Sequence, residues 1–326
     1  MHVALLGATG AVGRTMLQVL AERKLPVDRL TLLASPRSKG RAVRWGGREW
    51  ACSVAEPGSF RGVDFALFSA GADRSREWGP RAAEEGAVVV DNSSAWRMDP
   101  QVPLVVPEVN GDAARERPRG IIANPNCSTI QMVVALEAVR RAAGLTRVVA
   151  TTYQSVSGAG ETGRSALRDE LLGHRPEESP FARQISGNVI PQIGDLDAEG
   201  WTGEERKMIG ETRKILGLPD LPVAATCVRV PVEVGHSVQV MVETERELSV
   251  DDARAALAAF PGVVVDGDAA RYPTPLETAG RDEVFVGRIR RDPFLPRTLH
   301  LWVVADNLRK GAATNAVQIV EELSGA

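Results

Sequence analysis

A glycine-rich turn near the start of the chain constrains the fold more than any other stretch. An apolar run at residues 3–6 leads into it, the turn reads Gly7-Ala8-Thr9-Gly10-Ala11-Val12-Gly13, and a helical pattern follows to about residue 23. This order predicts a buried strand that passes into a helix. Glycines at such a junction let the backbone approach a pyrophosphate at the helix N-terminus. The spacing departs from the usual G-x-G-x-x-G, so a plain strand–helix turn is the alternative.

Apolar runs and helical patterns alternate through the first 127 residues. Further strands are predicted at 30–34, 64–68, 88–90, 104–106 and 121–123, and a hairpin at 41–54 that turns at Gly46-Gly47. Strands that alternate with helices form a parallel sheet, which binds ligands at the carboxyl ends of its strands. Small residues at one such end, Ser69 and Gly71, would let a nucleotide lie close. The expected fold class is α/β, with a Rossmann-like, doubly wound nucleotide-binding domain.

The loop after the second strand bears on the choice of cofactor. About 20 residues beyond the glycines, a domain that binds NAD places Asp or Glu against the ribose 2′-hydroxyl. This chain has Ser35, Arg37, Ser38 and Lys39 there instead. Because hydroxyls and cations suit a 2′-phosphate, we expect NADP. A solvated basic loop is the alternative, and it carries more weight for Lys39 than for Arg37.

Cys127 has the sequence context of a nucleophile. It lies in Asn124-Pro125-Asn126-Cys127-Ser128-Thr129, between an apolar run at 120–123 and a helical pattern at 130–142, so Ser128 or Thr129 is the expected N-cap. A thiol at a helix N-terminus faces unpaired N–H groups and the positive end of the helix dipole, both of which favour the thiolate. A buried core cysteine is the alternative, but polar, turn-forming neighbours argue against it.

The pattern changes after the cysteine helix. Strands are predicted at 148–155, 223–232, 237–244, 284–290 and 298–305, with helices after Gly158-Ala159-Gly160, after Trp201-Thr202-Gly203 and at 310–323. Strands that follow one another directly predict a mixed or antiparallel sheet, and hence a second, α+β domain. The boundaries expected are 1–127 plus 309–326 for the nucleotide domain and 128–308 for the second. The stretch 171–186 matches no pattern, and its role is open.

Composition excludes several classes of function. A net charge of −3 gives no electrostatic case for nucleic acid or an anionic membrane surface, and no apolar run approaches the length of a membrane span. The three cysteines form no C-x-x-C pair, which indicates free thiols in a reducing, cytoplasmic compartment. Met1-His2 leads directly into a strand, so we expect no signal peptide. No cluster of His, Cys and Asp has ligand spacing, so no metal is expected.

Other polar residues in the second half could act with Cys127. His236 lies in Gly235-His236-Ser237 at a strand junction and could shuttle a proton, with a structural histidine as the alternative. Arg229, on the preceding strand, could clamp a carboxylate, or could form an ordinary ion pair. Glu204 and Lys207 lie three residues apart on one face of a predicted helix.

Together these motifs resemble the aspartate-β-semialdehyde dehydrogenase family, from the first strand to the last helix. The resemblance rests on the glycine turn, on Asp91-Asn92-Ser93-Ser94-Ala95-Trp96-Arg97, on the Cys127 motif, on Gln154-Ser155-Val156-Ser157-Gly158 and on Gly235-His236-Ser237. It implies reduction of L-aspartyl-4-phosphate by NADPH through a cysteine thioester, in the biosynthesis of lysine, threonine, methionine and diaminopimelate. It also implies a catalytic and dimerisation role for the second domain, in a homodimer or homotetramer.

The resemblance assigns roles to residues as follows. Cys127 would be the nucleophile and His236 the acid/base. Gln154 would position the acyl-enzyme, Arg229 would hold the substrate carboxylate and Glu204 its ammonium. Phosphate would be held by Arg97, Asn126 and Lys207. The cofactor would be contacted by the glycine turn, by Ser35, Arg37 and Ser38, and by Ser69 and Gly71. Further cofactor contacts would come from Ser157, Gly158 and Asn307.

Two alternatives remain open. N-acetyl-glutamyl-phosphate reductase shares fold and mechanism, but its acetylated substrate has no use for a carboxylate at Glu204 that would bind an ammonium. A non-catalytic nucleotide-binding homologue would not need Cys127, His236, Arg229 and Lys207 together.

Overall fold

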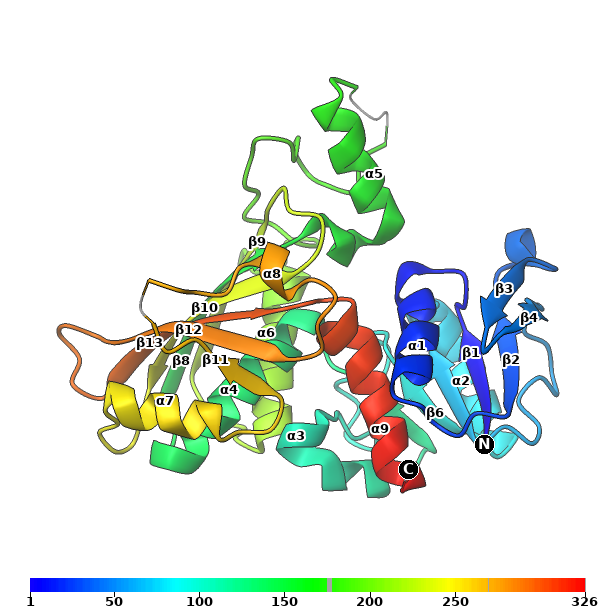
Figure 1. The fold of residues 1–326 in the computed structure, drawn as a ribbon, viewed down its shortest axis with the longest axis horizontal. Coiled ribbons are helices and arrows are strands. Elements are labelled where there is room, and N and C mark those ends of the chain that lie inside the picture. The colour runs from blue at the N-terminus through cyan, green and yellow to red at the C-terminus, as the bar shows by residue number, and fades with distance from the viewer. Residues whose placement is uncertain (175–177, 269, 326) are drawn as a thin grey trace. The chain divides into compact units, whose positions relative to one another are not determined.

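The computed structural model describes residues 1–174, 178–268 and 270–325. The chain forms two compact units, one of Met1–Asn126 with Ala312–Ala326 and one of Cys127–Gly311. Figure 1 labels their helices and strands along the chain.

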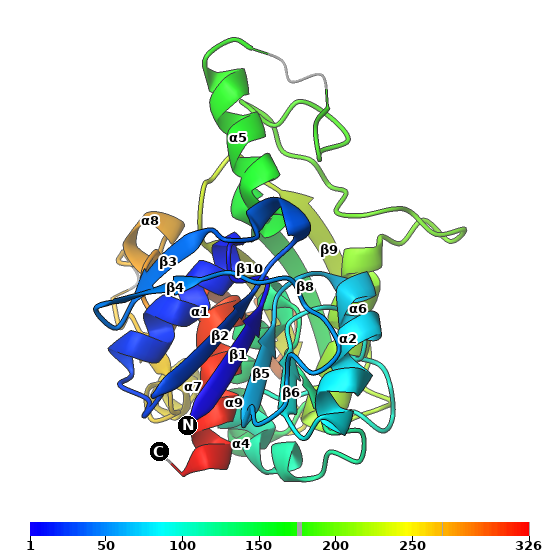
Figure 2. The same ribbon diagram turned by 90° about the vertical axis from the view of Figure 1, so that its right-hand side faces the viewer.

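The first unit is built on a five-stranded parallel sheet in the order β2-β1-β5-β6-β7. The strands are β1 (His2–Leu6), β2 (Arg29–Leu33), β5 (Phe65–Phe68), β6 (Val88–Asp91) and β7 (Ile121–Ala123), and the hairpin β3 (Ala42–Trp45) and β4 (Arg48–Ala51) stands apart. The helices are α1 (Ala11–Glu22), α2 (Ala72–Glu84), α3 (Pro107–Asn110) and α9 (Thr314–Ser324), with short 3-10 turns at Pro36–Ser38 and Gly111–Arg115. Figure 2 shows β2, β1, β5 and β6 side by side.

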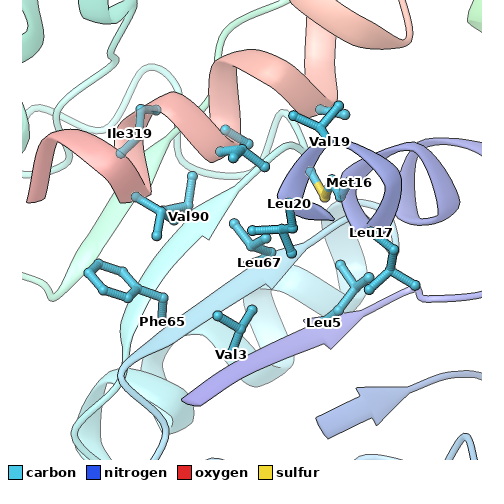
Figure 3. Packing of buried hydrophobic residues seen from close by; sticks show 14 of the residues in the cluster. Val3, Leu5, Met16, Leu17, Val19, Leu20, Phe65, Leu67, Val90 and Ile319 are labelled. Atoms are coloured by element: carbon cyan, nitrogen blue, oxygen red, sulfur yellow. The ribbon is translucent and has the colours of Figure 1, made fainter. Parts of the chain in front are cut away.

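Helices cover both faces of this sheet because the strand side chains alternate. Phe65 and Leu67 point into a core that they share with apolar residues of α1 and α9, as Figure 3 shows. Phe68 points to the opposite face, where its ring packs 5.7 Å from that of Phe60, which in turn packs 6.3 Å from Trp78 of α2. Strands apolar on both sides need this double cover, so the doubly wound α/β prediction is confirmed.

The second unit contains a six-stranded mixed sheet in the order β11-β12-β13-β10-β8-β9. Its strands are β8 (Arg147–Gln154), β9 (Val223–Arg229), β10 (His236–Glu243), β11 (Val263–Val265), β12 (Val284–Arg291) and β13 (Thr298–Ala305). The helices α4 (Cys127–Ala143), α6 (Gly203–Leu216) and α7 (Val250–Ala258) pack against the sheet, while α5 (Gly160–Leu171) and α8 (Pro275–Thr278) lie in its connections. The predicted α+β class of this half is confirmed.

Three local predictions were wrong. Residues 104–106 form no strand: their pairing with β7 is limited to one isolated bridge, between Leu104 and Ala123. The cysteine helix begins at Cys127 itself, so Ser128 and Thr129 lie in its first turn and are not its N-cap. The last helix is preceded by a π-helical turn at Arg309–Ala313, and α9 begins only at Thr314. Within the stretch 171–186, whose role the sequence left open, residues 175–177 lie outside the described part of the chain.

Candidate functional site

A cavity of about 390 Å³ lies in the first unit where the strand order reverses, at the carboxyl ends of β1, β2 and β5. Ligands of open α/β sheets bind at such a switch point. Five of the predicted cofactor residues line it: Gly7, Thr9, Gly10, Ser35 and Ser69. Ala11, Val12, Gly13, Arg37, Ser38 and Gly71 are not among its lining residues.

Two glycines make this turn possible. Gly7 has φ of 95°, and a Cβ there would lie 2.4 Å from the carbonyl oxygen of Ser69. A Cβ on Gly13 would lie 2.3 Å from the carbonyl oxygen of Gly7. Glycine therefore brings β1, the start of α1 and the end of β5 together around the cavity.

The sequence did not identify two charged residues that line the same cavity. Arg74 and Glu77, in the first turns of α2, form an ion pair of 2.7 Å. Their signal was weak, because a charged residue early in a helix is usually only a solvated surface group. Ser35 is exposed and precedes the 3-10 turn that carries Arg37, whose side chain is also exposed.

In the second unit, strand register brings three predicted site residues into one row. Gln154 at the end of β8 pairs with Arg229 at the end of β9 and with His236 at the start of β10. Residues directly opposite on neighbouring strands point to the same face. All three are buried, with exposed fractions of 1%, 6% and 0%.

Glu204 joins this row from the first turn of α6. Its carboxylate accepts hydrogen bonds from Gln154 Nε2 at 3.0 Å and from Lys207 Nζ at 3.1 Å. A capping box between Thr202 and Glu205 fixes where α6 begins, and Glu205 also accepts the backbone N–H of Cys227. The helix start is thereby tied to β9, which holds Glu204 beside the row.

Arg229 is held from several sides. Its Nη1 donates to the carbonyl oxygen of Ser155 at 2.7 Å, and its guanidinium lies 5.9 Å from the ring of Phe181. Burial lowers the pKa of Arg229, an effect opposed by the negative charge of Glu204. A cavity of about 300 Å³ lies against it, lined otherwise by residues 179–182 and 192–195. Part of the unassigned stretch 171–186 thus reaches Arg229 through Phe181.

His236 is completely buried and its Nδ1 accepts the backbone N–H of Ser155 at 3.0 Å. Burial, and next to it the positive charge of Arg229, lower the pKa of His236 to about 3. In the described part of the chain, its Nε2 has no hydrogen-bond partner. The ring is therefore neutral at physiological pH.

Cys127 is the first residue of α4 and is partly exposed, whereas Cys52 and Cys227 are buried. A Cβ on Gly311 would lie 2.9 Å from Cys127 Cβ, so only glycine fits there. One helical turn after the cysteine, Gln131 donates to the backbone carbonyl of His236 at 3.0 Å. Gln131 was not predicted as a site residue, although an amide inside an apolar helix is a usable signal.

The other two thiols differ from Cys127 in their surroundings. Burial raises the pKa of Cys227, and the charge of Glu204 adds to the effect. Burial also raises the pKa of Cys52, although the charge of Arg41 opposes it. Both are therefore poor nucleophiles at neutral pH.

Asn307 holds the loops that flank His236. Its Oδ1 accepts the backbone N–H of Gly235 at 2.9 Å and the hydroxyls of Ser155 and Ser157 at 3.2 Å, and its Nδ2 donates to Ser157 at 2.9 Å. Gly158 follows without a side chain: a Cβ there would lie 3.2 Å from His236 Nε2. The predicted cofactor residues Ser157, Gly158 and Asn307 are thus close neighbours of the histidine.

Arg97 and Asn126 belong to the first unit, and both are buried. Arg97 donates to the carbonyl oxygens of Asn124 at 2.9 Å and Asn92 at 3.0 Å, so part of its guanidinium serves the backbone. Among the described residues, no group of three His, Cys, Asp or Glu could hold a metal ion, and no helix is long and apolar enough to cross a membrane.

Comparison with known proteins agrees with these features. The family model described as "Semialdehyde dehydrogenase, NAD binding domain" matches residues 2–117, and "Semialdehyde dehydrogenase, dimerisation domain" matches residues 136–310. An aspartate-semialdehyde dehydrogenase of Aquifex aeolicus is 52% identical, over 99% of this chain and 97% of its own length.

The solved structures that resemble this chain are also aspartate semialdehyde dehydrogenases. The structure of aspartate semialdehyde dehydrogenase II from Vibrio cholerae has 49% identity and a TM-score of 0.96, over 99% of this chain and 98% of that one, and the enzyme is also known complexed with ASA. An aspartate semialdehyde dehydrogenase with NADP from Candida albicans has 26% identity and a TM-score of 0.78, with the same coverage.

Proposed function

The chain belongs to the aspartate-semialdehyde dehydrogenase family, and from this premise we propose that it reduces L-aspartyl-4-phosphate to L-aspartate-4-semialdehyde and releases phosphate. The observation that carries the proposal is the buried row of Arg229, Gln154 and His236, with Glu204 bonded to Gln154. An arginine and a carboxylate at one buried site suit an amino-acid substrate, which carries both a carboxylate and an ammonium group.

Cys127 is proposed as the nucleophile. A thiolate at the start of α4 would displace phosphate from the acyl phosphate and leave a thioester. Hydride from the cofactor would then give a thiohemiacetal, which collapses to the aldehyde and returns the thiolate. His236 would be the acid/base partner, and Gln154 would position the acyl group.

The substrate and phosphate contacts follow the same assignment. Arg229 would hold the substrate carboxylate and Glu204 its ammonium. Arg97, Asn126 and Lys207 are the residues proposed to hold phosphate. Charged hydrogen bonds to a leaving phosphate stabilise the charge that develops on it. Lys207 offers the ammonium group for such a hydrogen bond from α6, and its side chain is 40% exposed.

NADP is the proposed cofactor, bound in the first unit. The switch-point cavity and its glycine turn support a dinucleotide, and the exposed Ser35 and Arg37 support a 2′-phosphate rather than a free hydroxyl. The Candida albicans relative was solved with NADP. The remaining proposed contacts are Ser157, Gly158 and Asn307 near His236.

We also propose that the protein is a homo-oligomer, a dimer or tetramer, formed through the second unit. The outward side of its sheet carries Val149 and Tyr153, each more than a third exposed, and Tyr153 packs 5.5 Å from the ring of Trp302. Aromatic and aliphatic side chains on an open sheet face are typical of subunit interfaces. The proposed setting is cytoplasmic biosynthesis of lysine, threonine, methionine and diaminopimelate.

Oxidation in the reverse direction tests the proposal. The purified protein, NADP and phosphate are mixed with L-aspartate-4-semialdehyde or with N-acetyl-L-glutamate-5-semialdehyde, and NADPH formation is followed. We expect kcat/KM for the first substrate to exceed that for the second by roughly 10²-fold or more, because an acetylated amine carries no positive charge for the Glu204 carboxylate to bind. A preference for the acetylated substrate, or no NADPH from either, would refute the proposal.

A further inference from the structure

We propose that Phe181 is a positioning residue for the substrate carboxylate, because its ring holds the guanidinium of Arg229 in place. The inference rests on the proposed function and deepens it, since it concerns how Arg229 is fixed for that substrate. Its starting point is the contact between the two side chains, in which the guanidinium carbon of Arg229 lies 5.9 Å from the centre of the Phe181 ring.

Arg229 has few partners for a buried arginine. It is 6% exposed at the end of β9. Within the described chain its side chain donates a single hydrogen bond, from Nη1 to the carbonyl oxygen of Ser155 at 2.7 Å, and it forms no ion pair there. Glu204, whose charge acts on it, forms an ion pair with Lys207. One hydrogen bond fixes one nitrogen of the guanidinium and leaves the group free to turn about it, with its other N–H groups available to a ligand.

The ring supplies a contact that does not use those N–H groups. A cation within about 6 Å of the centre of an aromatic ring is attracted by the negative face of the ring, more strongly where water is excluded. A carboxylate binds best when both of its oxygens meet a fixed guanidinium fork. Phe181 therefore limits the motion of Arg229 without competing with the substrate for its hydrogen bonds.

A small apolar cluster holds the ring. Phe181 packs against four buried residues that come from the turn after β8, from α5 and from the segment 185–190: Val156, Leu167, Ile185 and Ile190. A Cβ on Gly163 of α5 would lie 3.2 Å from Phe181 Cζ, so α5 also approaches the ring closely. Three parts of the chain thus fix the ring that contacts the arginine.

Backbone hydrogen bonds tie the segment that carries Phe181 to α5 and to Arg229 itself. Glu170 of α5 accepts the backbone N–H of Ile185 at 2.8 Å and that of Ser186 at 2.7 Å. Ile190 exchanges two backbone hydrogen bonds with Arg229, of 2.9 and 2.8 Å. Part of the stretch 171–186, for which the sequence offered no role, is in this way built around the arginine.

Arg229 and Phe181 also line the same cavity, of about 300 Å³. This volume is at the lower end of the range for ligand pockets and suits a small polar molecule. The guanidinium and the ring therefore meet at a space that can admit the carboxylate end of an amino-acid substrate.

A pair of substrates that differ only in the carboxylate tests the proposal. The oxidative assay contains NADP, phosphate and either L-aspartate-4-semialdehyde or 3-aminopropanal, and kcat/KM for the second aldehyde is measured at high enzyme concentration. Phe181→Leu keeps an apolar side chain and removes the ring. Ile185→Val is the matched control, because it trims the same cluster and leaves the ring.

We expect Phe181→Leu to raise KM for L-aspartate-4-semialdehyde roughly 5- to 10-fold, with kcat changed less than about 2-fold, because uniform binding of the carboxylate is weakened. The preference for this substrate over 3-aminopropanal should fall by the same factor, and it should not change in Ile185→Val. Equal losses on both substrates, or the same loss in Ile185→Val, would assign the effect to general packing and overturn the proposal.

A measurement without turnover separates this proposal from the proposed function. The full chain is labelled with ¹⁵N-arginine, and the Nε–H signal of Arg229 is assigned by its loss in Arg229→Lys. Because the ring current of Phe181 displaces a signal this near, we expect it to move in Phe181→Leu and to stay in place in Ile185→Val. A signal that does not move in Phe181→Leu would overturn the proposal.

The two measurements fail in different ways. If neither aldehyde gave NADPH while the Arg229 signal moved in Phe181→Leu, the proposed function would fail and the contact of Phe181 with Arg229 would stand. Phe181→Met, which is unbranched and also lacks a ring, replaces Phe181→Leu in both measurements if leucine prevents folding.

Discussion

The burial and the lowered pKa of His236 follow from its position at the start of β10. As the first residue of that strand it lies against Gln154 of β8, with no exposed surface, and Ser155 meets its Nδ1. The sequence indicated only that a histidine stood at a strand junction. It could not indicate burial or the lowered pKa, because both depend on neighbours such as Gln154 and Arg229 that only the register of the sheet brings near.

Burial of a neutral histidine predicts how stability depends on pH. The pKa of His236 falls from its ordinary 6.5 to about 3 in the folded protein, so below pH 6.5 the unfolded chain binds a proton that the native ring does not. This contribution to stability is present above pH 6.5 and is lost as pH falls toward 3, at up to about 1.4 kcal/mol per pH unit.

We therefore expect the melting temperature of the native protein to fall more between pH 7.5 and pH 5 than that of His236→Gln. Differential scanning calorimetry of both proteins gives the comparison. Parallel losses in the two proteins would mean that His236 is not held neutral.

Lys207 gives a second prediction at this scale. If its ammonium holds phosphate, Lys207→Ala should raise the phosphate Michaelis constant in the oxidative assay by roughly 10- to 100-fold, since a charged hydrogen bond contributes about 1.5–3 kcal/mol. Arg206→Ala is the control, because Arg206 is the neighbouring cation on α6 but pairs with Asp197 and Glu199 at the surface. The same change in both variants would assign the effect to general charge and not to a phosphate site.

At the scale of elements, the sequence predicted most strands and helices. The passage from β1 through the glycine turn into α1 was predicted correctly, and the turn needs its glycines because a Cβ on Gly7 or Gly13 would collide with backbone oxygens. The segment 104–106 was misjudged, because its apolar residues are buried beside β7 without pairing as a strand. Gln131 and Phe181 were missed, since their contacts lie far away in the sequence.

Gly13 allows a test of this packing. Gly13→Ala would put a Cβ 2.3 Å from the carbonyl oxygen of Gly7 and must push α1 away from the turn, so we expect a loss of about 2 kcal/mol or more of unfolding free energy and weaker NADP binding. Gly10→Ala, whose Cβ would lie 3.3 Å from the same oxygen, should cost much less. Urea unfolding and cofactor titration measure both effects. Equal costs at the two positions would show that the close approach of α1 does not matter.

At the scale of the whole molecule, the second unit has a sheet covered by α4, α6 and α7, while its outward strand residues include exposed apolar groups. Subunit association would explain why Tyr153 and Trp302 form an aromatic pair there. The sequence could not identify this face, because a strand covered on both sides by its own chain and a strand covered on one side by a second subunit both carry apolar residues on both faces.

We expect Tyr153→Asp to dissociate the oligomer, because a charge in the middle of an apolar interface loses its hydration without gaining a partner. Leu276→Asp is the control: Leu276 is 91% exposed on α8 and should leave association unchanged. Sedimentation velocity at several protein concentrations reports the assembly state. A Tyr153→Asp protein that sediments like the native one would place the interface elsewhere.

Cys127 is proposed to carry the acyl group, and trapping that group tests this role most directly. The protein is mixed with L-aspartate-4-semialdehyde and NADP in the absence of phosphate, quenched in acid, and its mass and peptides are measured. We predict one aspartyl adduct per chain, located on Cys127, absent from Cys127→Ser and released when phosphate is added before the quench. An adduct on Cys52 or Cys227, or NADPH formation with no adduct on Cys127, would contradict the account.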